Sequence, residues 1–135
     1  MIRAVIDTNV FVSGIFWKGP PFQILEAWAD GKFKLIVTSE ILSEYERVFG
    51  ELNKKAKNPN SGRILELVKL NAEMANPVAF TKPICRDKDD DKFLAAALGG
   101  SAQYIVTGDD DLLVLDGHEG LKISKPKAFL KEIED

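Results

Sequence analysis

Four aspartates stand within five consecutive positions of the segment RDKDDDKFLAAAL, residues 86–98; they are Asp87, Asp89, Asp90 and Asp91. Like charges at this density repel one another and oppose compaction of the chain. A divalent cation such as Mg²⁺ or Mn²⁺ would cancel this repulsion, because these ions prefer carboxylate oxygens as ligands. Such sites serve phosphoryl chemistry, in which the ion activates water and stabilises the leaving oxygen. An aspartate at a helix start also accepts backbone N–H bonds, which explains Asp89 or Asp90 without any chemistry.

Two more acids stand close after the ends of predicted strands. Asp7 ends the apolar run 2–6, and Asp109 follows the run 104–107 after one glycine. Because ligands bind beyond the carboxyl ends of parallel strands, we expect both carboxylates at the same edge of a sheet. Glu44 lies at the margin of the apolar arc of a predicted helix, from which it can lean over that edge. A solvated position on the helix surface is the alternative for Glu44.

Hydrophobic periodicity predicts the elements that must position these acids. The predicted strands are residues 2–6, 34–37, 77–80, 104–107 and 121–124. The predicted helices are residues 20–30, 41–52, 64–75, 93–98 and 127–133, with a linker after Asp7 and a loop at 53–62. Strands that alternate with helices predict an α/β fold. We expect a single domain over residues 1–135, with a mainly parallel central sheet of about five strands flanked by helices.

Composition excludes several classes of protein. The chain has one cysteine and one histidine, Cys85 and His118, which are too few for a disulfide or a Cys/His zinc site. No apolar run approaches the ~20 residues that cross a bilayer, and the N-terminus has no export signal, so we expect a cytoplasmic protein without a membrane partner. The net charge of −3 gives no general basic surface for nucleic acid. Contacts to phosphates must therefore be local, and the candidates are Lys54, Lys55 and Lys57.

The sequence resembles the PIN-domain ribonucleases over essentially its whole length, in particular the toxins of VapC-like type II toxin–antitoxin pairs. The order and spacing of five segments carry the resemblance: VIDTNVFVSGIF, GPPFQIL, FKLIVTSEILSEYERVF, RDKDDDKFLAAAL and YIVTGDDDLL. The resemblance implies an endoribonuclease that depends on Mg²⁺ or Mn²⁺ and hydrolyses RNA phosphodiester bonds. It also implies a cognate antitoxin protein as partner and a homodimer.

The same resemblance implies the residues of the site. The four acids of the family fall on Asp7, Glu44, Asp91 and Asp109, which would be both the catalytic residues and the metal ligands. Asp91 is preferred to Asp90 because the family's acid stands three residues before an aliphatic residue followed by alanine, here Leu94 and Ala95. Periodicity alone does not separate Asp90 from Asp91. The supporting polar residues implied by the family are Asn9, Thr107 and Asp111.

Two other classes stay open on the residues alone. A Mg²⁺-dependent phosphoacceptor or phosphatase domain also places aspartates at strand ends. A nucleophile of the haloacid-dehalogenase type, however, needs a second aspartate two residues after Asp7, where Asn9 stands. For a response-regulator receiver, Lys125 is only a loose match to the expected lysine. The non-enzymatic alternative is a catalytically silent binding module of the same fold, against which all four expected acids are present.

Overall fold

Five short strands form one sheet in the order β3-β2-β1-β4-β5 in the computed structural model, which describes residues 1–56 and 62–134. Their bounds are β1 Arg3–Ile6, β2 Lys34–Val37, β3 Glu73–Met74, β4 Tyr104–Val106 and β5 Lys122–Ser124. Every neighbouring pair runs parallel. The predicted α/β fold, with a parallel sheet of about five strands, is confirmed.

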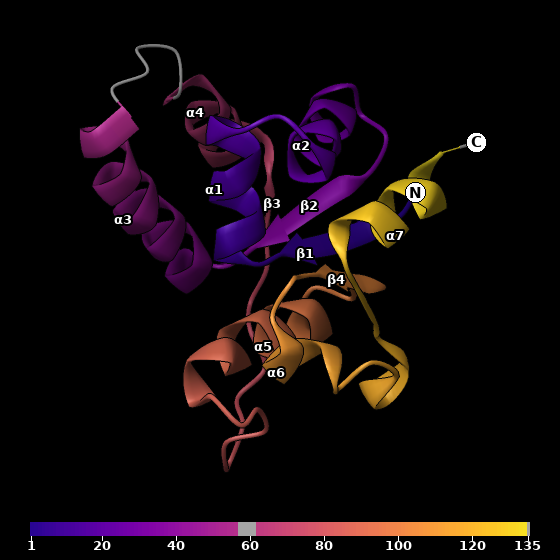
Figure 1. Ribbon diagram of the computed structural model, residues 1–135. Helices are drawn as coiled ribbons and strands as arrows, with labels where there is room; N and C mark the ends of the chain where they lie inside the picture. Colours follow the sequence, from indigo (N-terminus) through magenta and orange to yellow (C-terminus); the bar gives the residue numbers. More distant parts are fainter. Residues whose placement is uncertain (57–61, 135) are drawn as a thin grey trace.

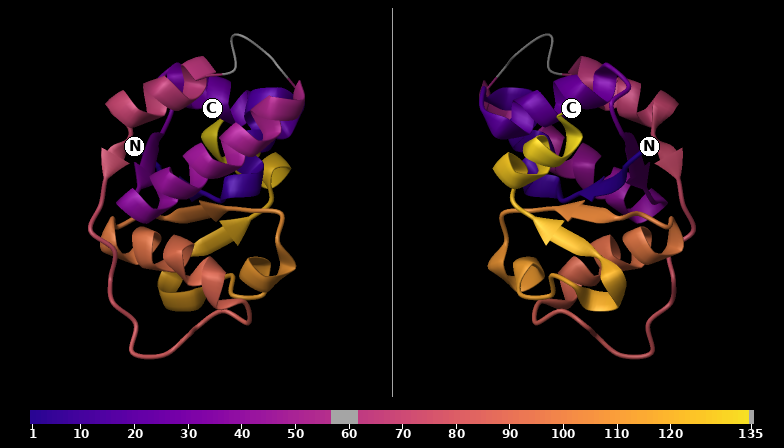
Figure 2. Two further views of the ribbon diagram at one scale, coloured as in Figure 1. Left: turned by 90° about the vertical axis from the view of Figure 1, so that its left-hand side faces the viewer. Right: turned by 90° about the vertical axis from the view of Figure 1, so that its right-hand side faces the viewer.

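Helices cover both faces of this sheet. They are α1 Thr8–Phe16, α2 Pro20–Ala29, α3 Ser39–Ala56, α4 Gly62–Asn71, α5 Asp91–Gly99, α6 Asp110–Leu113 and α7 Pro126–Ile133. Two short 3₁₀ helices, η1 Lys88–Asp90 and η2 His118–Gly120, lie between them. Figure 1 shows α1, α2 and α3 on one side of the sheet and α5 and α6 on the other, and Figure 2 shows the same three layers from the side. No helix in the described ranges is long and apolar enough to cross a membrane.

The middle of the sheet fixes where a ligand can bind. Strand β1 is central and buried on both faces, with Ala4, Val5 and Ile6 all fully inaccessible to solvent. From β1 the chain first builds β2 and β3 on one side and later places β4 and β5 on the other. The strand order therefore reverses between β1 and β4, and a crevice beyond the carboxyl ends of these two strands is the usual ligand site of such sheets.

Residues 8–16 form helix α1 and not the expected linker. Asp7 is the N-cap, and its Oδ1 accepts a hydrogen bond from the backbone N–H of Val10 at 2.9 Å. The helix packs against both α2 and α3, so that Val10, Phe11 and Val12 are all buried. A helix that is apolar on most of its surface has no amphipathic pattern, which is why the periodicity missed it.

The third predicted strand is also misplaced. The helix expected at 64–75 ends at Asn71, and the short edge strand is β3 at residues 73–74, while residues 77–80 form no strand. The segment after β3 instead crosses α5 closely: a Cβ atom on Gly99 would lie 1.9 Å from the carbonyl oxygen of Asn76. Only glycine permits this approach, which leads the chain from the sheet edge towards the aspartate cluster.

Candidate metal centre

Asp7 is a buried carboxylate at the end of the central strand, with an exposed fraction of 5%. Its Oδ1 is bound by the Val10 N–H, and its Oδ2 accepts a hydrogen bond from the hydroxyl of Thr107. Burial raises the pKa of Asp7, these two hydrogen bonds oppose the rise, and the negative charges of Asp109 and Glu44 add to it. A buried carboxylate with other carboxylates near it is an environment that a cation would stabilise.

Asp109 reaches the same place from β4. This strand pairs with β1 in the register Ile6↔Val106, so the residues that follow both strands are neighbours. The backbone N–H of Asp109 donates to Thr107 Oγ1 at 3.0 Å, and its Oδ1 accepts the N–H of Asp111 at 2.9 Å. The expectation that Asp7 and Asp109 share one edge of the sheet agrees with this arrangement.

Asp90 joins this group from the end of η1. One carboxylate oxygen from each of Asp90, Asp109 and Asp111 lies within 4.8 Å of the others. Asp90 Oδ2 is buried and has no hydrogen-bond partner among the residues that the structure describes. Burial, followed by the negative charge of Asp109, raises the pKa of Asp90 to about 7. An unpartnered buried oxygen beside two other carboxylates fits a hard cation such as Mg²⁺ or Mn²⁺.

Asp91, the acid chosen from the sequence, lies in a different environment. Its carboxylate accepts hydrogen bonds from the backbone N–H groups of Cys85 at 2.7 Å and Ile84 at 3.1 Å. Burial opposes ionisation, but these hydrogen bonds hold the pKa of Asp91 below its usual value. Asp91 therefore fixes the preceding loop against the start of α5. The structure brings Asp90, and not Asp91, to the other acids, because consecutive residues at a helix start point in directions about 100° apart.

Glu44 reaches the site from α3, which Thr38 caps through a 3.2 Å hydrogen bond from the N–H of Ile41. Lys92 Nζ lies 2.5 Å from Glu44 Oε1, and the hydroxyl of Thr8 donates to Oε2. Burial alone would raise the pKa of Glu44, but the hydrogen bonds from Lys92 and Thr8, with the charges of Lys92 and Arg47, hold it below its usual value. Glu44 is therefore an ionised and paired carboxylate.

The next residue on α3 fixes the position of Glu44 relative to the sheet. The hydroxyl of Tyr45 donates a hydrogen bond to the carbonyl oxygen of Ile6, the last residue of β1. The Tyr45 ring stacks on Phe11 of α1, with ring centroids 4.0 Å apart and an angle of 11° between the planes. Because Tyr45 is fully buried, these contacts hold the first half of α3 beside Asp7.

These side chains surround a hollow of about 200 Å³. It is lined by Asp7, Thr8, Asn9, Glu44, Arg47, Val48, Asp90, Phe93 and Asp109. Of the residues expected from the sequence, the structure thus gathers Asp7, Glu44, Asp109 and Asn9, with Thr107 bound to Asp7. Asp111 lies beside Asp90 and Asp109, but Arg86 pairs with it through an Nε–Oδ1 hydrogen bond of 2.7 Å.

Three residues at or beside the hollow were not among the site residues expected from the sequence. Asp90 is adjacent to Asp91 in a run of three aspartates, and periodicity did not separate the two. Arg47 is three positions after Glu44 on the same helix, a spacing at which side chains are neighbours. Its Nη2 lies 3.9 Å from Glu44 Oε1. Lys92 gave no signal, because its partner is 48 residues away in the sequence.

The predicted phosphate contacts lie farther from the hollow. Lys54 and Lys55 are exposed in the last turn of α3 and not in a loop. Lys57 lies outside the described residues. At 1.5 Å per residue, Lys54 is about 15 Å along the helix axis from Glu44. Their position is compatible with contacts to a nucleic-acid backbone that extends away from the acids.

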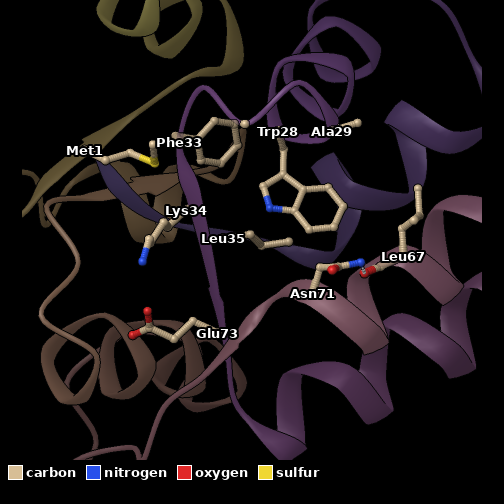
Figure 3. A pocket seen from close by; sticks show the side chains of 10 residues that line it. Met1, Trp28, Ala29, Phe33, Lys34, Leu35, Leu67, Asn71 and Glu73 are labelled. Atoms are coloured by element: carbon tan, nitrogen blue, oxygen red, sulfur yellow. Dashed lines mark hydrogen bonds between the residues drawn. The ribbon is translucent and has the colours of Figure 1, made fainter.

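A separate pocket of about 590 Å³ lies between α2, α4 and the β2–β3 edge of the sheet. Figure 3 shows Trp28, Phe33 and Leu35 along its wall, with Lys34 and Glu73 as the charged residues. None of the acids that follow β1 and β4 lines it. Its mainly apolar lining does not suit the metal chemistry expected from the aspartates.

Comparisons with known proteins give a consistent result. A family model described as PIN domain matches residues 3–111, a range that contains every acid of the hollow. A protein of Methanocaldococcus jannaschii, described as uncharacterized protein MJ1680, is 35% identical, and the match covers 98% of this chain and 92% of that protein. The crystal structure of PAE2754 from Pyrobaculum aerophilum is similar with a TM-score of 0.64 and 12% identity, over 98% of this chain and 89% of the other. At that identity the structural similarity supports the fold alone.

Proposed function

This chain belongs to the PIN domain family, which implies a nuclease, and on that premise we propose that it is a metal-dependent endoribonuclease that hydrolyses RNA phosphodiester bonds. The observation that carries the metal dependence is the buried, unpartnered Oδ2 of Asp90 beside the carboxylates of Asp109 and Asp111. In our proposal Asp90 takes the place that the sequence analysis gave to Asp91. Asp7, Asp90 and Asp109 are then the principal ligands of Mg²⁺ or Mn²⁺.

The donor set determines the kind of ion. All of these ligands are carboxylates, and the chain has one cysteine and one histidine. Oxygen donors without sulfur or imidazole favour Mg²⁺ or Mn²⁺ over zinc. When bound, such an ion polarises a phosphoryl oxygen and lowers the pKa of water.

The remaining residues prepare the site for this chemistry. Thr107 holds the Asp7 carboxylate in one orientation through its hydroxyl group. Glu44 presents its negative charge at the wall of the hollow, while Thr8 and Lys92 bind its two oxygens. Arg47 also lines the hollow, and its guanidinium group can bind a phosphate in a planar, bidentate contact.

RNA is the proposed substrate, and α3 is its proposed path. Arg47 lies at the hollow, and Lys54 and Lys55 follow on the same helix. Contacts of this kind bind the phosphate backbone and carry no sequence information. Lys57 stays a sequence-based prediction.

The proposal includes a biological setting that the sequence resemblance alone supports. In this setting the protein is the toxin of a type II toxin–antitoxin pair, acts as a homodimer in the cytoplasm and is inhibited by a cognate antitoxin protein. Expression of the chain in a bacterial host should then arrest growth, and the Asp7→Asn variant should not. Growth at the normal rate under full expression of active enzyme would contradict the toxin role. The proposal of a nuclease would still stand.

The nuclease itself is tested by cleavage of a defined single-stranded RNA with purified protein. We expect cleavage with Mg²⁺ or Mn²⁺ and none with EDTA. The Asp7→Asn and Asp90→Asn variants should lose it, and Asp91→Asn should retain it. Equal activity of wild type and Asp7→Asn would indicate a contaminating nuclease and contradict the proposal. Stable labelling of Asp7 by acetyl phosphate would instead favour the phosphoacceptor class.

A further inference from the structure

Positive side chains already pair with two of the acids around the centre. The five carboxylates at or beside the hollow belong to Asp7, Glu44, Asp90, Asp109 and Asp111. Glu44 is paired with Lys92 and, at the longer distance of 3.9 Å, with Arg47, and Asp111 is paired with Arg86. Three aspartates are left without an ion pair among the described residues. Only these three contribute negative charge that a bound cation must balance.

The three ion pairs differ in strength. The Arg47 and Arg86 side chains are 62% and 78% exposed, so water and salt screen their interactions with Glu44 and Asp111. The side chains of Lys92 and Glu44 are only 12% and 19% exposed, and their charged atoms lie 2.5 Å apart. Lys92 on α5 is therefore a fixed positive charge beside Glu44 of α3, which lines the hollow.

This ammonium group opposes a second ion on Glu44. The Thr8 hydroxyl donates a hydrogen bond to Glu44 Oε2, so a cation could approach Glu44 only on the side of Oε1. Since Mg²⁺–oxygen bonds are about 2.1 Å long, an ion on Oε1 would lie within about 5 Å of Lys92 Nζ. Two cations this close in a partly buried site repel each other strongly.

We propose that Lys92 supplies, as an ammonium group fixed on Glu44, the positive charge that a second divalent ion would otherwise bring, so that the centre binds one ion. This inference rests on the proposed function, because it assumes that Asp7, Asp90 and Asp109 bind a divalent cation. Lys92 acts through Glu44 and is a positioning residue. A purely structural link between α3 and α5 would leave the number of bound ions unchanged.

The experiment measures the number of Mn²⁺ ions bound per chain, by calorimetry and by electron paramagnetic resonance of the metal-free protein titrated with Mn²⁺. Wild type should bind one ion. Lys92→Met keeps the length of the side chain without its charge and should double the bound Mn²⁺, with a magnetically coupled spectrum, because paired ions lie about 4 Å apart. Lys92→Arg keeps the charge and should bind one ion.

Two further variants separate the effect of Lys92 from a general change of charge. Lys88→Met removes the same charge at an exposed position four residues earlier and should still bind one ion. The double variant Lys92→Met with Glu44→Gln also removes the carboxylate charge that would bind the second ion. It should therefore bind one ion again.

The possible outcomes distinguish the inference from the proposed function. Two ions on wild type, or one ion on a folded Lys92→Met variant, would overturn the role of Lys92 and leave the metal-dependent nuclease intact. No Mn²⁺ binding to wild type would overturn both. Circular dichroism of each variant checks that it is folded.

Discussion

Thr107 and Asp7 are 100 residues apart in the sequence, yet the hydroxyl of Thr107 donates a hydrogen bond to Asp7 Oδ2. The same oxygen of Thr107 accepts the backbone N–H of Asp109 at 3.0 Å. One fully buried hydroxyl group thus connects Asp7, directly after β1, with Asp109, three residues after the end of β4. The two carboxylates most firmly placed by the parallel sheet are held in register by a neutral side chain.

The Thr107→Val variant tests this connection. Valine has almost the same shape but leaves the Asp7 carboxylate and the Asp109 N–H each without one hydrogen bond. We expect the free energy of unfolding of the metal-free protein to fall by about 1–3 kcal/mol, measured by urea denaturation. Thr107→Ser keeps the hydroxyl and should lose less. Equal stability of the valine variant and wild type would show that the connection does not contribute.

The Asp90→Asn and Asp91→Asn variants should affect different properties. Removing the charge of Asp90 takes away a proposed ligand, so Mn²⁺ affinity should fall at least about 10–100-fold, the loss that accompanies even outer partners of metal ligands. Asp91→Asn weakens the hydrogen bonds to the Cys85 and Ile84 N–H groups. It should lower the free energy of unfolding by about 1–3 kcal/mol and leave Mn²⁺ affinity nearly unchanged. The opposite pattern would restore Asp91 as the ligand.

The stability of the metal-free protein should fall as the pH rises from about 4 to about 7. In the folded chain the pKa of Asp90 is about 7, whereas an aspartate in the unfolded chain titrates near 3.9. Between these values the folded state binds the extra proton, so stability decreases with increasing pH. Urea denaturation at a series of pH values measures this slope. Asp90→Asn, which does not titrate, should reduce it.

Added metal should act against this pH dependence. Below pH 7 an ion must displace the proton of Asp90, whereas at pH 8 the carboxylate is already ionised. Mg²⁺ or Mn²⁺ should therefore raise the melting temperature more at pH 8 than at pH 6. A larger rise at pH 6 would contradict the assignment of Asp90 as a ligand.

The sequence predicts the central part of this fold well because the signals there are local. The run at residues 2–6 is followed by Asp7 and the run at 104–107 ends in Thr107, and both runs prove to be neighbouring strands of a parallel sheet. Because β1 and β4 are parallel neighbours, Asp7 and Asp109 lie at the same edge of the sheet, and this follows without knowing where the helices pack. The α1 helix was not predicted because most of its residues are apolar and pack against α2 and α3, so its sequence shows no clear amphipathic pattern.

The remaining site residues depend on tertiary contacts that no local pattern contains. Asp90 and Asp91 are adjacent and chemically identical, and only the loop that donates its N–H groups to Asp91 determines which one faces the centre. The pairing of Lys92 with Glu44 likewise depends on how α5 and α3 pack. A helical projection could place Glu44 near the sheet edge but could not show its partner.

The Tyr45→Phe variant tests whether α3 is fixed to the sheet by a single hydrogen bond. Phenylalanine keeps the stack on Phe11 but leaves the buried carbonyl oxygen of Ile6 without the hydroxyl donor. The free energy of unfolding should fall by about 1–3 kcal/mol in urea denaturation. Tyr104→Phe is the matched control: the Tyr104 ring packs edge-on against Phe129, and the same substitution there should lower the free energy of unfolding by less than Tyr45→Phe does. Because Tyr45 adjoins Glu44, its loss should also loosen the wall of the hollow, and Mn²⁺ affinity should fall in Tyr45→Phe and not in Tyr104→Phe. Unchanged stability of Tyr45→Phe would mean that ring packing alone holds the helix beside Asp7.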